Sequence, residues 1–267
     1  MTLPARRILV PDDFTAASSH TWAWARRFAA PGARLASLYV YDAPPAPVMG
    51  LPAPPLTGRA ENALLERMRE ERPDASSWRV AEGDAVTRIL RASRRADLVV
   101  LGTHGRTGLA RAAFGSVAEA VMHEAAVPVL AVRGAPGKTA TVLAPVTLES
   151  YAYRGLLLAA EAAAFLGAEL VLLHLTPPGK REGNPRFFID SLVARLPPAL
   201  REKTRPRLLL RGGEPIAGIL AEARRHGLVV LTAHRKSLLG DLVLGTTVER
   251  VVRHSPTAVL AAPSSGR

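Results

Sequence analysis

The stretch that decides the fold spans residues 98–122 and reads LVVLGTHGRTGLARAAFGSVAEAVM. Residues 98–101 are all apolar and predict a buried strand, whereas residues 117–122 predict a helix. The loop between them is rich in glycine, and backbone N–H groups can approach an anion closely where glycine leaves no Cβ. A helix N-terminus also favours negative charge. This order of strand, loop and helix therefore predicts a phosphate site, and hence a bound nucleotide.

Composition places the chain among globular proteins and excludes several other classes. Its 267 residues are 48% hydrophobic, which is enough for two ordinary domains. No apolar run reaches about 18 residues, so no membrane-spanning helix is expected, and residues 8–10 are too short for a signal-peptide core. We therefore expect a cytoplasmic protein without membrane contact. Cysteine is absent, which excludes disulfides and thiolate chemistry.

The formal net charge of +12 could attract phosphate-bearing ligands or nucleic acid. However, the basic residues form no long run and do not alternate with aromatic residues. The charge is therefore interpreted as a solvated surface, and nucleic-acid binding ranks last among the functions considered.

The chain contains the same pattern twice. The apolar run 98–101 recurs at 228–231, and Gly115-Ser116 recurs as Gly245-Thr246. We therefore expect two domains, residues 1–135 and 138–267, joined near 134–137.

Apolar runs alternate with helical periodicity in each half. The fold class is therefore predicted as α/β, with two tandem Rossmann-like domains, each a five-stranded parallel doubly wound sheet with helices on both faces. The proline-rich residues 43–56 predict a loop that could serve as a lid or a partner surface. In the first half we expect strands at 6–10, 35–41, 77–81, 98–101 and 127–132, and helices at 16–29, 59–71, 85–94 and 117–122.

Polar residues follow the first predicted strand, at Pro11-Asp12-Asp13-Phe14-Thr15. In a doubly wound sheet, ligands bind beyond the carboxyl ends of the strands, at the point where the strand order reverses. Asp13 or Thr15 could therefore bond a base edge, a ribose or a phosphate-bound metal. Alternatively, Asp12, Asp13 and Thr15 cap the helix that starts near Ala16. Spacing alone does not decide between these two roles.

The glycine-rich loop offers further ligand groups. Gly102, Gly105 and Gly115 would allow close approach of the backbone, and Ser116 would add a hydroxyl at the helix start. His104 and Arg106 could reach a triphosphate or could be exposed loop residues. The chain lacks the pattern G-x-x-x-x-G-K-[ST], so it is not a P-loop NTPase. The first strand-helix turn also lacks G-x-G-x-x-G, which disfavours dinucleotide binding.

Taken together, these motifs resemble the universal stress protein family. The pattern Gly102-x2-Gly105-x9-Gly115-Ser116 is similar to that family's nucleotide-binding pattern. Residues 8–15 resemble its opening strand with a strand-end Asp, and residues 127–132 resemble its last strand. The resemblance covers nearly the whole chain, as two tandem domains.

The resemblance implies membership of the ATP-binding subfamily, with magnesium held through the phosphates and no metal held by the protein itself. It implies that Asp13 and the backbone of Val40 contact adenine, while Pro11, Asp12 and Thr15 line the side of the ribose and metal. The other ATP-binding residues would be Leu101, Gly102, His104, Gly105, Arg106, Gly115, Ser116 and Val117.

In the family, the last strands commonly pair across a dimer. Here residues 127–132 and 258–262 would pair within one chain and form an intramolecular pseudo-dimer. A homodimer of whole chains and a further protein partner are left open.

The second half departs from the binding pattern. Thr232 and Arg235 stand where Gly102 and Gly105 stand in the first half, and Thr147 replaces Asp13. We therefore expect the second domain to bind ATP weakly or not at all. Alternatively, Arg235 holds another anion.

The leading hypothesis is an ATP-binding stress-response sensor or regulator without strong enzymatic activity. The alternative is a slow nucleotide hydrolase, in which His104 is the candidate general base. Against the alternative, no Ser/His/Asp set or pair of carboxylates stands out at catalytic spacing, so no catalytic residue is assigned.

Overall fold

The computed structural model describes residues 3–15, 17–42, 55–103, 115–149, 151–233, 235–238, 241–244 and 246–263. The first domain alternates strands with helices, as expected. Its elements are β1 (Ala5–Pro11), α1 (Ala17–Phe28), β2 (Ala29–Tyr41), α2 (Gly58–Glu71), β3 (Ser77–Glu82), α3 (Ala85–Ser93), β4 (Leu98–Gly102), α4 (Ser116–Glu124) and β5 (Val129–Val132).

The second domain repeats this order with two additions, a divided helix and a hairpin. Its elements are β6 (Thr141–Pro145), α5 (Ala152–Leu166), β7 (Glu169–Thr176), α6 (Pro185–Ala194), α7 (Pro198–Thr204), β8 (Arg207–Gly212), α8 (Pro215–Ala223), β9 (Leu228–Ala233), β10 (Arg235–Leu238), β11 (Asp241–Leu244), α9 (Thr246–His254) and β12 (Ala258–Pro263).

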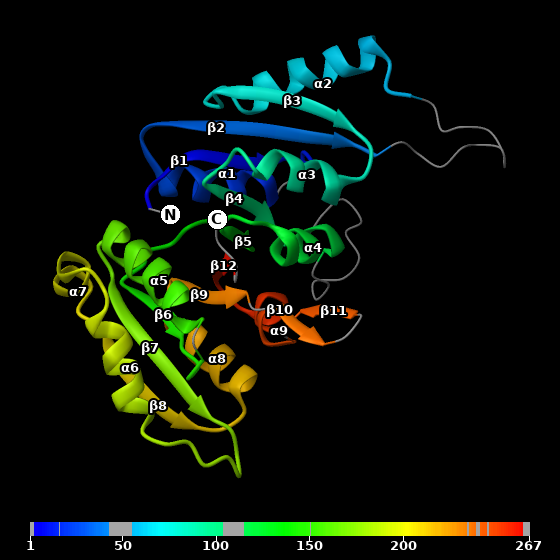
Figure 1. Cartoon of the computed structure of the whole chain (residues 1–267). Coiled ribbons are helices and arrows are strands. Elements are labelled where there is room, and N and C mark those ends of the chain that lie inside the picture. The colour runs from blue at the N-terminus through cyan, green and yellow to red at the C-terminus, as the bar shows by residue number, and fades with distance from the viewer. Residues whose placement is uncertain are drawn as a thin grey trace.

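One ten-stranded sheet runs through both domains in the order β3-β2-β1-β4-β5-β12-β9-β6-β7-β8. Within each domain the paired strands are parallel, and the order reverses between β1 and β4 and again between β6 and β9. At the join, β5 and β12 are antiparallel, with Leu130 opposite Leu260. This pairing confirms the prediction that the last strands meet within one chain. Figure 1 shows the result as two similar halves on either side of β5 and β12.

Two hydrophobic cores cover the two faces of the sheet. Alternate strand residues point to opposite faces, so Leu98 and Val100 belong to one core while Val99 and Leu101 belong to the other. Helices α1 and α5 cover the first face, and α3, α4, α8 and α9 cover the second. Burial on both faces explains why these strands are apolar almost throughout.

Two features differ from the sequence-based expectation. Strand β2 begins directly after α1 and is longer than the predicted strand 35–41, because Ala29 and Arg34 also pair with the start of β1, across a register irregularity between Ala5 and Arg7. The antiparallel hairpin β10–β11 was not expected. It occupies the sequence position that the glycine-rich loop occupies in the first domain. Thr232 and Arg235 replace two of that loop's glycines, and residues with a side chain favour an extended conformation more than glycine does.

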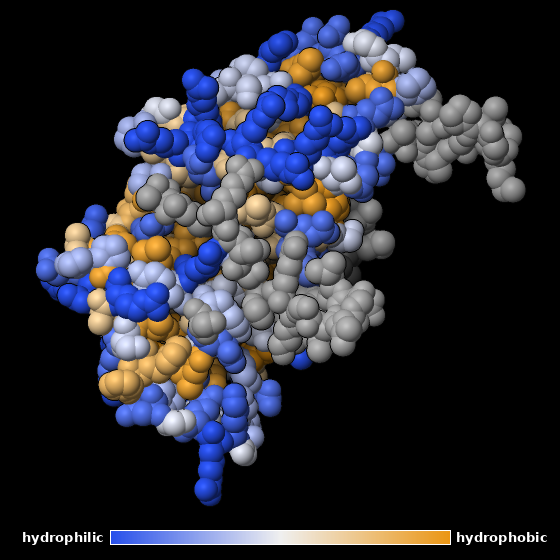
Figure 2. Space-filling view, viewed as in Figure 1, coloured by the Kyte–Doolittle hydropathy of each residue, from blue (hydrophilic) through white to orange (hydrophobic). Residues whose placement is uncertain are grey.

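Most of the proline-rich stretch 43–56 lies outside the described residues. Over the parts that are described, no helix is long and apolar enough to cross a membrane. Figure 2 shows hydrophobic surface over α6, where Phe187 is 73% exposed.

Candidate functional site

The structure brings the ends of three neighbouring strands of the first domain to one edge of the sheet. Pro11 ends β1 and Gly102 ends β4, and these two strands pair where the strand order reverses. Val40 lies near the end of β2, which pairs with β1 on its other side. Pro11, Val40, Leu101 and Gly102 therefore lie at the edge where a doubly wound sheet places its ligand.

Backbone hydrogen bonds bring the two ends of the glycine-rich loop together. Thr103 N donates to Val132 O at 3.0 Å, and Gly115 N donates to Thr103 O at 2.8 Å. Helix α4 consequently begins directly beside the end of β4. His104, Gly105 and Arg106 lie outside the described residues.

The N-terminus of α4 has no capping side chain. Helices α2 and α3 begin at Thr57 and Asp84, whose side chains accept from backbone N–H groups of the first turn. In α4 the N-cap is Gly115, and no side chain caps the helix in the described part of the chain. The N–H groups that begin with Ser116 and Val117 therefore lack this partner at the positive end of the helix dipole. This arrangement can accept an anion at the carboxyl edge of the sheet.

Asp13 organises the turn between β1 and α1. Its Oδ1 accepts from Thr15 N at 3.0 Å, from Thr15 Oγ1 at 2.7 Å and from Ser18 Oγ at 3.0 Å. Phe14 adopts a φ of 60°, a left-handed conformation that this turn holds in place. Asp13 thus makes the helix-start contacts of the structural alternative. All three bonds use Oδ1, so among the described residues Oδ2 stays available as an acceptor.

Asp12 is part of a buried ion pair. Its carboxylate accepts from Arg72 Nε at 2.6 Å and from Trp22 Nε1 at 2.9 Å, and its side chain is 0% exposed. Burial alone would raise the pKa of Asp12, but the bonds from Arg72, Phe14 N and Trp22 outweigh it and lower that pKa. Asp12, which was predicted to line the side of the ribose and metal, therefore connects the end of β1 to α1 and to the end of α2.

Aromatic and cationic groups pack beside this turn. The rings of Phe14 and Tyr39 have centroids 5.0 Å apart, and the Arg67 guanidinium lies 4.0 Å from the Phe14 ring centroid. These contacts connect α2 to the same strand ends as the Asp12–Arg72 pair.

The corresponding turn of the second domain is built differently. Val146, which matches Asp12 by position, is buried and apolar, and Thr147 is exposed. The buried polar group comes instead from β7. His174 Nδ1 lies 2.9 Å from Val146 O, and its Nε2 lies 2.6 Å from Glu182 Oε2.

The carboxylate of Glu182 is the acceptor at the centre of this polar cluster in the second domain. It also accepts from Thr176 Oγ1 at 2.9 Å, and its side chain is only 9% exposed. Burial alone would raise the pKa of Glu182, but the hydrogen bonds from His174, Thr176 and Lys180 lower it. The second domain thus places an anion of its own beside the carboxyl end of β7.

Thr232 packs against a helix. A Cβ added to Gly155 of α5 would lie 2.1 Å from Thr232 Oγ1. The hydroxyl therefore points at α5, and Gly155 makes room for it. Arg235 begins β10, and its side chain is not described.

Helices α4 and α9, which occupy equivalent positions in the two domains, contact each other across the join between β5 and β12. Arg253 of α9 lies 3.3 Å from Glu119 of α4 and 3.0 Å from Glu249 of α9. Arg133, just after β5, donates to the Arg253 carbonyl. Burial and the neighbouring Glu249 raise the pKa of Glu119. This cluster connects the helix that begins at Ser116 to the second domain.

Sequence reasoning missed Arg72, His174 and Glu182. Arg72 pairs with a residue far away in the sequence, which no local spacing can reveal. His174 and Glu182 lie closer together, but they carry no recognised motif.

Comparison with known proteins adds the family. The sequence model of the universal stress protein family matches residues 4–133 and 139–263. A universal stress protein of Methanocaldococcus jannaschii is 33% identical over 144 residues, which are 48% of this chain and 82% of that protein. One of Mycobacterium tuberculosis is 44% identical over 78 residues, which span 28% of this chain and 26% of that protein's length.

Solved structures agree in fold over nearly the whole chain. A universal stress protein from Archaeoglobus fulgidus matches with a TM-score of 0.74 at 18% identity and covers 97% of this chain and 99% of that one. A protein assigned to the same family from Pseudomonas aeruginosa matches with a TM-score of 0.65 at 17% identity, covering 97% and 93%. The predicted fold class, two tandem α/β domains of the Rossmann-like type, is confirmed.

Proposed function

The chain belongs to the universal stress protein family, and we propose that its first domain binds ATP and acts as a stress-response sensor or regulator. The nucleotide lies across the carboxyl ends of β1 and β4, with its phosphates at the start of α4. Magnesium, where it is bound, is held through these phosphates.

The uncapped N-terminus of α4 carries this proposal together with its place beside the end of β4, since α5, α7 and α8 also begin without a side-chain cap. Gly115 offers no side chain to the first-turn N–H groups, and α4 starts at the strand-order reversal. An anionic ligand supplies the missing partner and gains the favourable interaction with the helix dipole. Ser116 adds a hydroxyl at the same place, and the loop predicted to cover the phosphates leads directly to it.

The adenine and ribose lie over the turn after β1 in this proposal. Asp13 Oδ2 is an acceptor suited to an exocyclic amine, and the Val40 backbone follows on the neighbouring strand. Asp12 acts indirectly, because its carboxylate is already bonded to Arg72 and Trp22. Its role is to hold Pro11 and the turn in position. A micromolar affinity, about 8 kcal/mol, is sufficient for such a sensor.

The nucleotide carried by the purified protein tests the proposal. The chain is denatured, and the released small molecules are separated on an ion-exchange column. We expect the released nucleotide to be intact ATP. We also expect the stripped protein to carry ATP again after it is incubated with ATP and separated from the excess. Absence of any nucleotide, before and after this incubation, would refute the proposal.

Phosphate release separates the sensor from the alternative hydrolase. Stripped protein is mixed with ATP and magnesium, and inorganic phosphate is followed over time. We expect bound ATP to remain intact. Turnover that disappears in His104→Ala would instead identify a hydrolase with His104 as its general base.

A further inference from the structure

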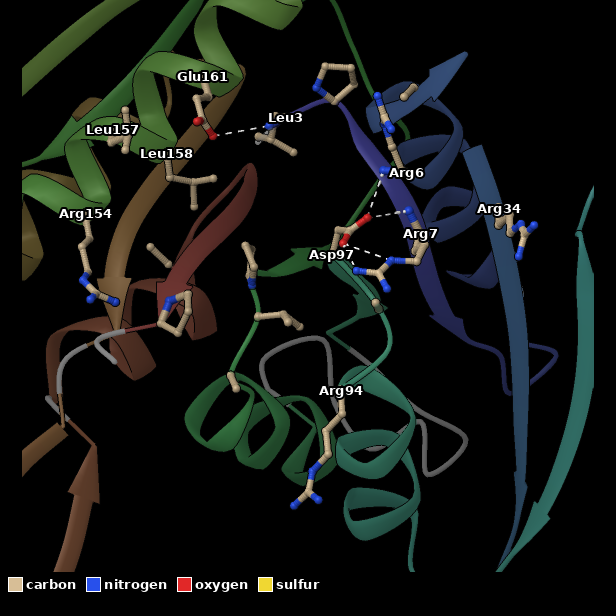
Figure 3. Close-up of a pocket in the computed structure, with 18 of the residues that line it drawn as sticks. Leu3, Arg6, Arg7, Arg34, Arg94, Asp97, Arg154, Leu157, Leu158 and Glu161 are labelled. Carbon is tan, nitrogen blue, oxygen red and sulfur yellow. Dashed lines mark hydrogen bonds and ion pairs between the residues drawn. The ribbon is translucent and has the colours of Figure 1, made fainter. Parts of the chain in front are cut away.

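A cavity of about 1480 Å3 lies at the edge of the first domain opposite the proposed nucleotide site. It borders the amino-terminal ends of β1 and β4, and its other wall comes from α5 and the end of β12 in the second domain. None of the residues predicted to bind ATP lines it. Figure 3 shows α5 on one side of the cavity and β1 and β2 on the other.

Apolar groups contribute somewhat more of the lining of this interdomain cavity than polar groups do. Leu157 and Leu158 contribute from α5, Val127 and Pro128 from the segment before β5, and Pro263 from the end of β12. Apolar walls favour a ligand with a hydrocarbon body, because each methylene group removed from water there contributes roughly 0.8 kcal/mol.

Cationic side chains surround these apolar walls. Asp97 and Glu161 are the only acids among the cavity residues, against five arginines. In the described part of the chain, only Arg7 of these arginines makes an ion pair, to Asp97 at 2.6 Å. The lining arginines are Arg6, Arg7, Arg34, Arg94 and Arg154.

Both acids already have partners inside the protein. Asp97 accepts from the backbone N–H groups of Arg6 and Arg7 as well as from the Arg7 guanidinium. Glu161 Oε2 accepts from Leu3 N at 3.3 Å, and burial raises the pKa of this carboxyl. The remaining arginines are exposed at the cavity mouth, where they can meet a charged headgroup that stays partly in water.

We propose that this cavity binds an amphipathic anion, a molecule with an acyl-like hydrocarbon body and a carboxylate or phosphate headgroup. The body lies against Leu157 and Val127, which are only half-buried, and the headgroup meets the exposed Arg154, which stands one turn of α5 before Leu157. Arginine suits this role because its planar guanidinium bonds carboxylates and phosphates in a bidentate manner. Figure 3 shows Arg154 and Leu157 on α5, whereas the Arg94 side chain runs along α3 away from them. Because Val127 belongs to the first domain, one ligand still contacts both domains.

The cavity is larger than such a ligand needs. Binding pockets for small organic ligands commonly measure about 300–1,000 Å3, so a medium or long acyl chain fits here with space left for water. Because its walls come from both domains, a bound ligand also favours the arrangement of the two domains seen here.

Isothermal titration of the full chain tests the inference with dodecyl phosphate and dodecanoate, each below its critical micelle concentration. Dodecanol and inorganic phosphate provide the uncharged chain and the free headgroup. We expect both amphipathic anions to bind, and each of the two partial probes to bind about tenfold more weakly or worse. Equal binding of dodecanol, or of inorganic phosphate, would overturn the proposal.

Charge-reversal variants locate the binding. In R154E, affinity for dodecyl phosphate falls by about tenfold or more, because an attractive charge becomes repulsive. The control R186E makes the same change in net charge at an exposed position of the second domain and retains affinity. Circular dichroism and thermal unfolding verify that both variants fold. Equal affinity of the two variants would overturn the site.

ATP provides the final distinction. Excess ATP leaves dodecyl phosphate bound, because the two ligands occupy opposite edges of the first domain. Stoichiometric displacement by ATP would assign the anion to the nucleotide crevice and would refute a separate site.

Phospholipid vesicles containing an anionic lipid distinguish the ligand source. Competition between these vesicles and dodecanoate identifies a membrane headgroup, whereas binding of the free acid alone identifies a soluble metabolite.

Discussion

The two domains share a fold but stabilise the carboxyl edge of the sheet in different ways. In the first, the buried charge of Asp12 belongs to the strand-end turn, and Arg72 of the α2 region neutralises it. In the second, Val146 replaces that charge, and the polar pair is His174 with Glu182. Both domains thus place carboxylates at this edge, Asp12 and Asp13 after β1 in the first and Glu182 beside the end of β7 in the second. Two copies of one fold can therefore retain the same core while the polar contacts at their strand ends differ.

The largest expected effect comes from breaking the buried pair of the first domain. Arg72→Met leaves the Asp12 carboxylate buried without its cation, which costs about 3–5 kcal/mol of unfolding free energy. Urea denaturation at neutral pH measures this loss. Arg59→Met removes an exposed arginine from the same helix and serves as the control.

A double variant distinguishes the buried charge from lost packing. Asp12→Asn combined with Arg72→Met recovers much of the stability, since no charge remains unneutralised. Failure of this recovery, with Arg59→Met harmless, would mean that Arg72 acts through packing alone.

The same pair predicts a dependence on pH. The pKa of Asp12 is lowered in the folded state, whereas in the unfolded chain it is about 3.9. The pair therefore stabilises the fold above that pH, and its contribution is lost as the pH falls through the lower, folded-state pKa. The stability difference between the native chain and Asp12→Asn should narrow on acidification. A difference that is constant with pH would contradict the ion pair.

Next in size is the effect of capping α4. Gly115→Asp places a carboxylate at the N-cap, where we propose that the phosphates bind. We expect ATP affinity to fall about hundredfold, because like charges compete for the same N–H groups. Unfolding free energy should rise by a few tenths of a kcal/mol or more, since Asp is a better N-cap than Gly.

Gly115→Asn is the matched control for that variant. It caps the helix without adding a charge, so it should reduce ATP affinity less than Gly115→Asp does. Unaltered ATP binding in Gly115→Asp, measured by titration calorimetry, would exclude α4 as the phosphate site.

An intermediate effect is expected where Thr232 packs on α5. Gly155→Ala brings a Cβ to within 2.1 Å of Thr232 Oγ1, so the helix or the strand must shift. We expect a loss of about 1–3 kcal/mol in unfolding free energy. Thr232→Ala in the same chain should restore most of it, and Gly58→Ala, which meets no neighbour, should not destabilise.

A double-mutant cycle on unfolding free energies quantifies this contact. Additive losses in Gly155→Ala and Thr232→Ala would show that Thr232 does not pack against α5.

The smallest expected effect concerns Glu182. Glu182→Gln weakens its bonds with His174 and Thr176 and should cost about 1 kcal/mol at neutral pH. Because the pKa of Glu182 is lowered in the folded state, this stabilisation exists above the unfolded value of about 4.3 and is lost as the pH falls further. Thermal unfolding across this pH range measures it, with the exposed Glu202→Gln as the control. Equal curves for the two variants would contradict a stabilising role for Glu182.

Much of the fold could be predicted from the sequence because its signals are local. Apolar runs such as residues 98–101 and 228–231 identify the buried strands, and their repetition identifies the second domain. Asp84 begins α3, as its capping preference predicts. The pairing of β5 with β12 required the family resemblance as well, since nothing local specifies which strand a chain end will meet.

The site was less accessible to sequence reasoning. Its strand-end residues were located by the rule for doubly wound sheets, but the role of each side chain depends on distant partners. From their spacing alone, Asp12 and Asp13 could either contact the ligand or cap the helix that follows. The structure bonds Asp12 to Arg72 and gives Asp13 a helix-start contact. Thr232 replaces a glycine of the binding pattern, and its hydroxyl faces Gly155 of α5, a pairing that only three-dimensional packing reveals.

Titration of ATP into the nucleotide-stripped full chain tests the central asymmetry most directly. One binding site per chain is predicted, and it should weaken strongly in Gly115→Asp. Two equivalent sites per chain, or no binding to a chain that is folded by circular dichroism, would contradict the account.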